Sequence, residues 1–248
     1  MLSNNAVQTY LRDHPEVSLM AEGSFFRRLL DRSGVAAAPE EAAERRAVWQ
    51  HLHRRALDGT GKSLSGPGSS LAQTRVVRAR LGGLLARIGA ASLLDAPCGD
   101  HHWMSHAGLE AGYVGVDIMP DLIERNRSRH PTREFQVADL ATDDLPRADL
   151  VLCRDALVHC SYRVALAMLR NFRRSGAEWL LTTTFRGHDD NHDIAVGDWR
   201  PLNLELPPFS FPPPAELIVE RCSEGDGRYR DKSLGLWRFA DLGPDAAM

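Results

Sequence analysis

The chain has little cysteine and no long apolar run. It contains 4 cysteines in 248 residues, and Cys98, Cys153, Cys160 and Cys222 show no paired spacing. Because three of them lie in or beside apolar runs, we expect buried free thiols in a reducing compartment rather than disulfides or metal ligands. No apolar run approaches the ~20 residues of a membrane span, and MLSNNAVQTY at the start lacks the features of a signal peptide. These absences predict a cytoplasmic protein.

The chain also lacks an excess of charge of one sign. It has 30 Lys and Arg against 33 Asp and Glu, a formal net charge of -3. This balance argues against a general polyanion binder, although basic stretches such as residues 125–133 occur. We therefore expect a small polar molecule as the partner, and neither nucleic acid nor a membrane. The sequence leaves monomer and homodimer both open.

What the chain does have is enough apolar sequence for one sizeable core. At 43% hydrophobic residues, its length fits one α/β domain with an appendage better than two equal domains. Segments such as SFFRRLLDR place apolar groups at three- and four-residue spacing, which predicts an N-terminal helical cap over residues 1–64. The remainder, residues 65–248, is the predicted main domain.

The main domain shows the alternation of an α/β fold. After the Gly- and Ser-rich residues 58–70 and a helical pattern over 71–90, short β-type runs alternate with helical stretches, which predicts a mostly parallel sheet with helices on both faces. Seven strands are expected, at 92–97, 113–118, 134–139, 148–154, 178–185, 216–222 and 234–240. The connection between the last two is too short for a parallel crossover, so it predicts an antiparallel hairpin at the end of the sheet.

Carboxylates follow the first three expected strands. In an open parallel sheet, ligands bind beyond the carboxyl ends of the strands. Asp95, Asp117 and Asp139 stand at three such ends. Gly99 allows a close approach of backbone to a ligand, and the amides of a helix expected to follow it would donate to an anionic group. Asp117, about 20 residues beyond Gly99, suits the two hydroxyls of a ribose.

The first loop distinguishes between two nucleoside cofactors. A dinucleotide fold needs G-x-G-x-x-G to admit a pyrophosphate, whereas this loop has one glycine flanked by Asp95 and Asp100. Two carboxylates repel a diphosphate but attract the sulfonium and ammonium of S-adenosylmethionine. The alternative is that both residues only cap a helix and form a turn. The acids at the next two strand ends favour the cofactor.

From about Ser65 to Phe239 the chain resembles a class I S-adenosylmethionine-dependent methyltransferase. More narrowly, it is similar to a bacterial group with LDxPCGDxxWM and GDWRPLNL motifs, which this chain matches in LDAPCGDHHWM, YVGVDIMPDLI, ADLVLCRDALVHCSY, LLTTTF, GDWRPLNLELPPF and DKSLGLW. The resemblance implies a Rossmann-like seven-stranded sheet with an antiparallel last strand. It also implies S-adenosylmethionine as cofactor and S-adenosylhomocysteine as product. His101 and His102 stand where the group has Phe-Asn, which puts the edge of the cofactor pocket in doubt.

The same resemblance implies individual cofactor contacts. Asp117 is expected on the ribose and Asp139 on the adenine amino group, while Ser69 lies in a loop like the one that covers the cofactor in the group. The full set of implied cofactor residues is Ser69, Asp95, Cys98, Gly99, Asp100, Asp117, Ile118, Asp139, Leu140 and Arg154.

A possible catalytic pair follows the fourth strand. In RDALVH, Asp155 and His159 are four residues apart, which predicts that they share one helix face. An aspartate there could hold the imidazole in the tautomer that acts as a base for the methyl acceptor. The alternative is that His159 serves packing or hydrogen bonding on the cofactor side.

The segment 186–214 is long for a connection and is predicted to be a functional loop. It interleaves carboxylates and amides with histidines and aromatic residues, and Trp199 suits the floor of a site for a ring. The expected substrate residues are Asp189, Asp190, Asn191, Asp193, Trp199, Asn203 and Glu205. A metal site at His188, Asp190, His192 and Asp193 is an alternative that we do not favour. A solvated polar loop is another alternative.

The surplus of acids in this loop favours a cationic acceptor. We expect N-methylation of an aminoglycoside or amino sugar in antibiotic biosynthesis, with His159 or a carboxylate such as Asp190 taking the proton of the amine. One alternative is O-methylation of a sugar or small hydroxylated metabolite. A second is an inactive methyltransferase-like binding subunit, whose sign would be the loss of cofactor acids; none is lost.

Overall fold

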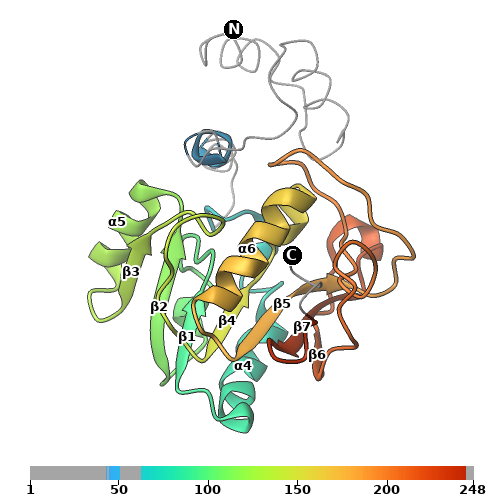
Figure 1. The fold of residues 1–248 in the computed structure, drawn as a ribbon. Coiled ribbons are helices and arrows are strands. Elements are labelled where there is room, and N and C mark those ends of the chain that lie inside the picture. Colours follow the sequence, from blue (N-terminus) through green and yellow to red (C-terminus); the bar gives the residue numbers. More distant parts are fainter. Residues whose placement is uncertain (1–42, 44, 51–62, 244–248) are drawn as a thin grey trace, which may run out of the picture.

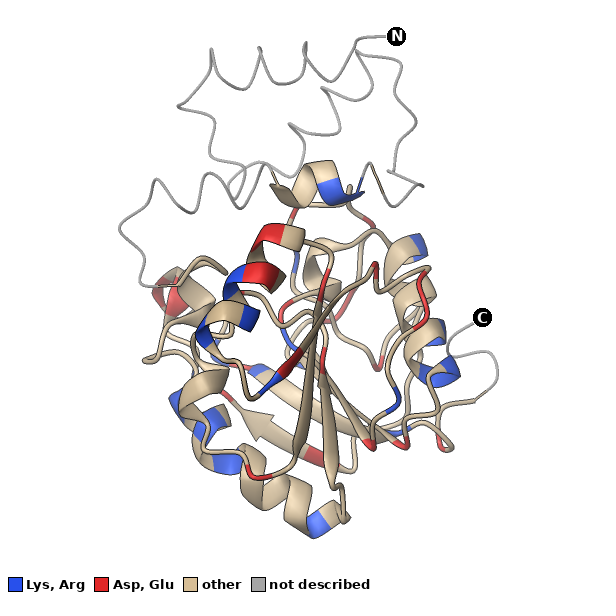
Figure 2. Cartoon of the chain, turned by 90° about the vertical axis from the view of Figure 1, so that its left-hand side faces the viewer, with Lys and Arg blue, Asp and Glu red and all other residues tan. Residues whose placement is uncertain are grey.

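The computed structural model describes residues 43, 45–50 and 63–243. Most of the predicted cap over residues 1–64, including the helix expected at SFFRRLLDR, lies outside the described residues. Residues 45–50 are helical, and they lie above the carboxyl ends of the strands in both views (Figure 1, Figure 2).

Seven strands form one sheet in the order β3-β2-β1-β4-β5-β7-β6 (Figure 1). Their bounds are β1 Ser92–Asp95, β2 Gly112–Asp117, β3 Glu134–Val137, β4 Leu150–Cys153, β5 Trp179–Phe185, β6 Glu216–Val219 and β7 Lys232–Arg238. The first five pair in parallel, and β7 runs antiparallel to both β5 and β6. The strand order reverses between β1 and β4, as in a doubly wound, Rossmann-like sheet. The predicted α/β fold with an antiparallel last strand is confirmed.

Helices cover both faces of the sheet because residues of the central strands alternate between two apolar clusters. α4 (Arg75–Ile88) buries Leu81 and Leu84 in the same cluster as Leu93 of β1. α6 (Tyr162–Arg174) buries Phe172 in the other cluster, together with Leu94 of β1. α5 (Pro120–Arg129) packs beside β2 and β3. A strand that is apolar on both faces is typical of a parallel sheet.

Two expected helices are absent from the connections. After β1 the chain forms turns and the three-residue 3-10 helix η2 (Met104–His106), so the predicted helix amides beyond Gly99 are not there. Gly99 and His101 have φ of 53° and 55°, in the left-handed region, which interrupts a right-handed helix. Asp155 has φ of 54°, and only Leu157–His159 (η3) form a 3-10 turn, so Asp155 and His159 do not share a helix face.

Two further 3-10 helices are η1 (Pro67–Ser69) and η4 (Glu224–Gly227). None of the helices in the described ranges is both long enough and apolar enough to span a membrane. Basic and acidic positions are both spread over the side of the molecule shown in Figure 2.

Candidate functional site

A cavity of about 300 Å³ lies at the carboxyl ends of β1, β2 and β4, beneath residues 45–50. Nine of the predicted cofactor residues line it: Ser69, Asp95, Cys98, Gly99, Asp117, Ile118, Asp139, Leu140 and Arg154. A volume of this size is at the lower end of the range for small-molecule and cofactor sites. The sheet therefore brings together almost all of the residues that the sequence associates with a cofactor.

Asp95, at the end of β1, presents one carboxylate oxygen that has no partner among the described residues. Its Oδ2 accepts a hydrogen bond of 2.7 Å from the Tyr113 hydroxyl, while no hydrogen bond to Oδ1 is present in residues 63–243. Burial raises the pKa of Asp95 to about 7, and the nearby charge of Asp117 adds to this effect. A buried carboxylate of this kind favours a cationic ligand group, because the cation stabilises its charged form.

Asp117, at the end of β2, receives backbone hydrogen bonds from two sides. Gly99 N donates to Oδ2 and Met119 N to Oδ1, both at 3.0 Å. Burial raises its pKa to about 6, and these amides partly oppose that effect. Each oxygen keeps a lone pair, so the carboxylate can still accept from two neighbouring hydroxyl groups.

Asp139, just beyond β3, is bound by the helical segment 45–50. Its Oδ2 accepts from Arg45 Nε at 2.9 Å and Oδ1 accepts from Ala141 N at 2.8 Å. The neighbouring Arg46 donates through Nε to the Ile118 carbonyl at 3.1 Å. The segment 45–50 is thus held at the ends of β2 and β3, and the predicted contact of Asp139 with an adenine amino group would share the carboxylate with Arg45.

Asp100 does not line the cavity, and its carboxylate holds residues 63–65 instead. It accepts from Leu64 N at 2.6 Å and from Ser63 Oγ at 3.0 Å, and the Asp100 amide donates to Ser65 Oγ at 3.1 Å. A Cβ on Gly99 would lie only 2.1 Å from Ser65 Oγ, so this chain crossing requires glycine. A direct contact of Asp100 with the cofactor stays a prediction. The hydrogen bonds that Asp100 makes hold residues 63–65 over Gly99.

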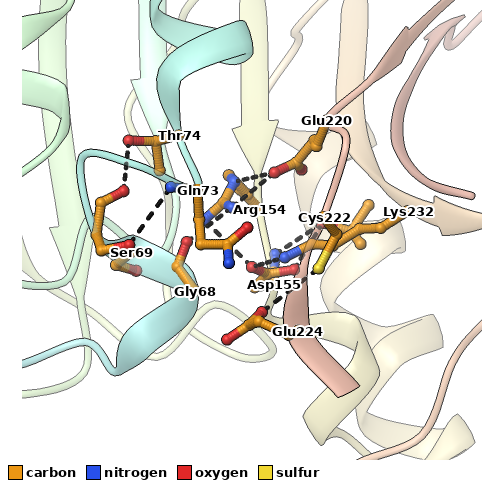
Figure 3. Close-up of polar contacts among 12 residues, drawn as sticks. Gly68, Ser69, Gln73, Thr74, Arg154, Asp155, Glu220, Cys222, Glu224 and Lys232 are labelled. Atoms are coloured by element: carbon orange, nitrogen blue, oxygen red, sulfur yellow. Dashed lines mark hydrogen bonds and ion pairs between the residues drawn. The ribbon is translucent and has the colours of Figure 1, made fainter. Parts of the chain in front are cut away.

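Arg154 and Asp155 belong to a buried charged network on the other side of the cavity (Figure 3). Arg154 donates to Glu220 Oε2 at 2.7 Å and to the Gly68 carbonyl at 2.9 Å, and Lys232 Nζ lies 2.5 Å from Asp155 Oδ2. Burial alone would raise the pKa of Asp155, but Arg154 and Lys232 outweigh it and lower the value to about 2. Asp155 therefore remains ionised at the cavity wall.

His159 also lines the cavity, and its ring is oriented by a carbonyl rather than by Asp155. Its Nδ1 lies 2.9 Å from the Asp198 carbonyl oxygen, which can only accept, so Nδ1 carries the proton and Nε2 keeps a lone pair. Burial lowers the pKa of His159, so the ring is neutral near pH 7. The sequence suggested that Asp155 could hold this tautomer, but the hydrogen bond that does so comes from the Asp198 carbonyl in the loop.

The loop 186–214 is docked on η3 through its backbone and through Arg200. Gly197 N donates to the His159 carbonyl at 2.8 Å, and the buried Arg200 donates to the Leu157 carbonyl at 3.1 Å. These contacts place the Asp198 carbonyl against His159.

Of the substrate residues expected in this loop, Trp199 lines the cavity and the other six do not. Asn191 and Asn203 bond to loop backbone, Glu205 pairs with Arg186, and Asp193 accepts from Tyr162 N at the start of α6. Asp189 and Asp190 are exposed. No group of three or more His, Cys, Asp or Glu in the described part of the chain could hold a metal ion.

Sequence reasoning missed several residues of the site. Arg45 contacts Asp139 from a segment with no recognisable motif, so only the tertiary structure reveals it. Glu220 directly follows β6, and Lys232 begins β7. For Lys232 the sequence did contain a signal, because this residue lies in the motif DKSLGLW.

Comparison with known proteins leaves the family open. No protein-family description matches the chain, and no curated protein sequence is similar to it. Among solved structures, a magnesium protoporphyrin IX methyltransferase from Synechocystis PCC 6803 is 17% identical, with a TM-score of 0.46; the match covers 63% of this chain and 82% of that one. The methyltransferase domain of bacterial CtHen1 is 15% identical, with a TM-score of 0.39 and coverages of 45% and 66%.

A third similar structure is CalS10, an amino pentose methyltransferase from Micromonospora echinaspora involved in calicheamicin biosynthesis. It is 24% identical, with a TM-score of 0.39, and the match covers 53% of this chain and 55% of that one. Similarities of this size do not establish a shared reaction.

Proposed function

We propose that this chain is an S-adenosylmethionine-dependent methyltransferase that acts on a small molecule. The observation that carries the proposal is the meeting of Asp95, Asp117 and Asp139, from three adjacent strand ends, in one cavity. Three carboxylates there disfavour a diphosphate and suit a nucleoside that carries positive charge. A dinucleotide cofactor is correspondingly disfavoured.

The residues present fit that cofactor. The open oxygen of Asp95 suits an ammonium group, and the two oxygens of Asp117 suit adjacent ribose hydroxyls. When bound, S-adenosylmethionine supplies a methyl group on a positively charged sulfur. The contribution of the chain is then to align the acceptor, exclude water and remove a proton where the acceptor carries one.

His159 is the residue that we assign to proton removal. Its Nδ1–H is fixed on the Asp198 carbonyl, so Nε2 is available as a base toward an acceptor in the cavity. The ionised Asp155 nearby stabilises the imidazolium that forms, since its charge favours the protonated ring. The proposed base is thus oriented by the loop and supported electrostatically by Asp155.

For the acceptor, the cavity lining supports a hydroxyl group on a flat, largely apolar molecule. Besides His159, the lining includes Trp49, Val164, Met168 and Trp199, and aromatic and apolar side chains favour a ring. The Trp49 ring stands edge-on to His159 at a centroid distance of 5.8 Å. This is the O-methylation alternative of the sequence analysis. The loop acids expected at the substrate instead contact the loop itself, the start of α6 or solvent.

An amine acceptor, such as an amino sugar, is the second candidate. It is supported by Asp155, a carboxylate on the cavity wall that stays ionised near pH 7 and could hold an ammonium group before His159 removes its proton. A role in antibiotic biosynthesis belongs to this second candidate.

Methyl transfer from labelled S-adenosylmethionine to matched acceptors tests the proposal. We would offer hydroxylated aromatic compounds, aminoglycosides and neutral sugars to the full chain and locate the added methyl group by mass fragmentation. Methylation of ring hydroxyls is the expected result. Transfer confined to amines would favour the second candidate. Cofactor binding with no transfer to any acceptor would favour an inactive binding subunit.

A further inference from the structure

Behind Asp95, on the side away from the cavity, two further side chains form a continuous hydrogen-bonded chain. The Tyr113 hydroxyl lies 2.7 Å from Asp95 Oδ2, and His101 Nδ1 lies 2.9 Å from the same hydroxyl. All three residues are buried, at 3% exposure for Asp95 and His101 and 7% for Tyr113. Neither His101 nor Tyr113 lines the cavity.

The direction of each hydrogen bond follows from proton counting. Tyr113 has one hydroxyl proton, and an ionised Asp95 can only accept, so that proton points to Asp95. His101 Nδ1 must then carry a proton and donate to the Tyr113 oxygen. If Asp95 is protonated, the chain can reverse: Asp95 donates to Tyr113, Tyr113 donates to Nδ1, and the imidazole proton is on Nε2. Both arrangements keep the two hydrogen bonds of the chain, and they differ in the tautomer of a neutral His101.

The backbone conformation and ring contacts of His101 hold its imidazole in place. Its backbone is in the left-handed region, and its ring makes edge contacts with Tyr113, His130 and Phe135 at centroid distances of 4.8, 4.7 and 5.2 Å. A non-glycine residue with positive φ is costly and persists where its surroundings fix it. Burial, followed by the charges of His130 and Arg133, lowers the pKa of His101 to about 4, so the ring is neutral at pH 7.

We propose that His101 and Tyr113 are positioning residues for the cofactor, which hold Asp95 ionised with its open oxygen directed at a ligand ammonium group. The inference rests on the proposed function, because S-adenosylmethionine supplies that ammonium. The other charged groups that face Asp95 are Asp117, which opposes its charge, and Arg154, which favours it. Cys98 also faces Asp95, and burial, followed by the charges of Asp117 and Asp95, raises the pKa of its thiol. Those that face His101 are His130, Arg133 and Asp100.

The test is the pH dependence of S-adenosylhomocysteine binding to the full chain, measured by titration calorimetry. Tyr113→Phe removes the hydroxyl and keeps the ring. His101→Asn removes the imidazole and keeps a residue that tolerates positive φ. Tyr229→Phe is the control, since it removes a hydroxyl that neither lines the cavity nor belongs to the hydrogen-bonded chain behind Asp95. Comparison with wild type at the same pH cancels the titration of the ligand itself.

Without the Tyr113 hydroxyl, Asp95 binds its proton more tightly. We expect Tyr113→Phe to weaken binding about tenfold at about pH 6.5 and to approach wild-type affinity near pH 8.5, because the pH midpoint moves up by about one unit. His101→Asn should shift the midpoint less, in the same direction. Binding of 5′-methylthioadenosine, which lacks the amino-acid end of the cofactor, should be unaffected by either substitution.

The imidazole supplies an independent readout. In ¹⁵N spectra, saturation with S-adenosylhomocysteine should shift His101 toward the Nδ1–H tautomer. A loss of affinity that is the same at every pH, or equal for 5′-methylthioadenosine, would overturn the inference and leave a structural role only. Failure of the wild-type chain to bind S-adenosylhomocysteine would instead refute the proposed function.

Discussion

At the scale of the residue, the account depends most on His159. In a neutral imidazole whose Nδ1–H donates to a carbonyl, Nε2 is the one nitrogen that can accept a proton from a substrate. If Asp155 had accepted the hydrogen bond from Nδ1, a carboxylate instead of a carbonyl would have set the tautomer of the ring. Asp155 is instead engaged by Lys232 and Arg154, and it acts on His159 through its charge.

We predict that His159→Asn lowers kcat by about 10²–10⁴-fold, the usual contribution of a general base, with little change in S-adenosylhomocysteine affinity. In the wild type, kcat should rise with pH, with a midpoint below the ordinary imidazole value of 6.5, because burial lowers the pKa of His159 and only the neutral ring accepts a proton. Steady-state kinetics across this range check both points. His106→Asn, at an exposed histidine, is the matched control. Unchanged kcat in His159→Asn would remove His159 from the reaction.

At the scale of the element, two irregular segments complete the site that the sheet begins. The strand ends supply Asp95 and Asp117, but the segment 63–65 covers the first loop and the loop 186–214 orients His159. Neither segment is part of a helix or strand. Hydrogen bonds to the Asp100 carboxylate hold residues 63–65, and both backbone and side-chain hydrogen bonds hold the loop 186–214. Substitutions that weaken these hydrogen bonds should change cofactor affinity and kcat to different extents.

For the segment 63–65 the critical residue is Asp100. Asp100→Asn weakens hydrogen bonds from Leu64 N and Ser63 Oγ to a charged acceptor, and bonds of this kind contribute about 1.5–3 kcal/mol. We expect faster amide exchange at Leu64 and Ser65 and about tenfold weaker cofactor binding, the lower end of that range. Hydrogen-exchange mass spectrometry and calorimetry measure the two effects. Asp121→Asn on the exposed side of α5 should change neither; wild-type exchange in Asp100→Asn would contradict the assignment.

For the loop 186–214 the critical residue is Arg200. Its guanidinium donates to the carbonyls of Leu157 and His192, which lysine cannot reproduce as a pair. Arg200→Lys should therefore lower kcat by displacing the Asp198 carbonyl from His159, while S-adenosylhomocysteine binding is retained. Parallel measurement of kcat and of the dissociation constant separates the two. The exposed Arg238→Lys serves for comparison, and equal loss of both quantities would indicate general unfolding instead.

The strands could be predicted from the sequence, whereas the contacts that these irregular segments make could not, for physical reasons. Apolar runs such as SLLD carry their pattern locally, and the acids at their ends are adjacent in the fold because parallel strands share one rim. By contrast, Asp155 and His159 have helical spacing, yet the left-handed backbone of Asp155 breaks the helix. The role of Asn191 or Asp193 likewise depends on which backbone groups the loop leaves without partners, and spacing alone does not contain that information.

At the scale of the whole molecule, buried carboxylates couple stability to pH. The pKa values of Asp95 and Asp117 are raised from 3.8 to about 7 and about 6. A carboxylate with a raised pKa in the folded state contributes stability that is fully present below its unfolded pKa and is lost as pH rises through the folded value. The unliganded chain should thus lose the stabilising contribution of both groups between about pH 4 and pH 7.

The cofactor should reverse this loss, because its ammonium compensates the charge of Asp95. We predict that saturating S-adenosylhomocysteine raises Tm by more at about pH 8 than at about pH 5.5, where Asp95 binds a proton without the ligand. Thermal unfolding with and without ligand at each pH gives this difference directly. An equal rise at both values would mean that Asp95 does not change its protonation on binding.

The central claim is that the three acids at the strand ends bind a cationic nucleoside. The most direct test is calorimetric titration of S-adenosylhomocysteine into the wild-type chain and into Asp117→Asn, with NAD⁺ as the competing class of nucleoside. We predict saturable binding at one site per chain, at least tenfold weaker in Asp117→Asn because a charged acceptor for the ribose hydroxyls is lost, and no binding of NAD⁺. Binding of NAD⁺ in place of S-adenosylhomocysteine, or equal affinity in the two proteins, would contradict the account.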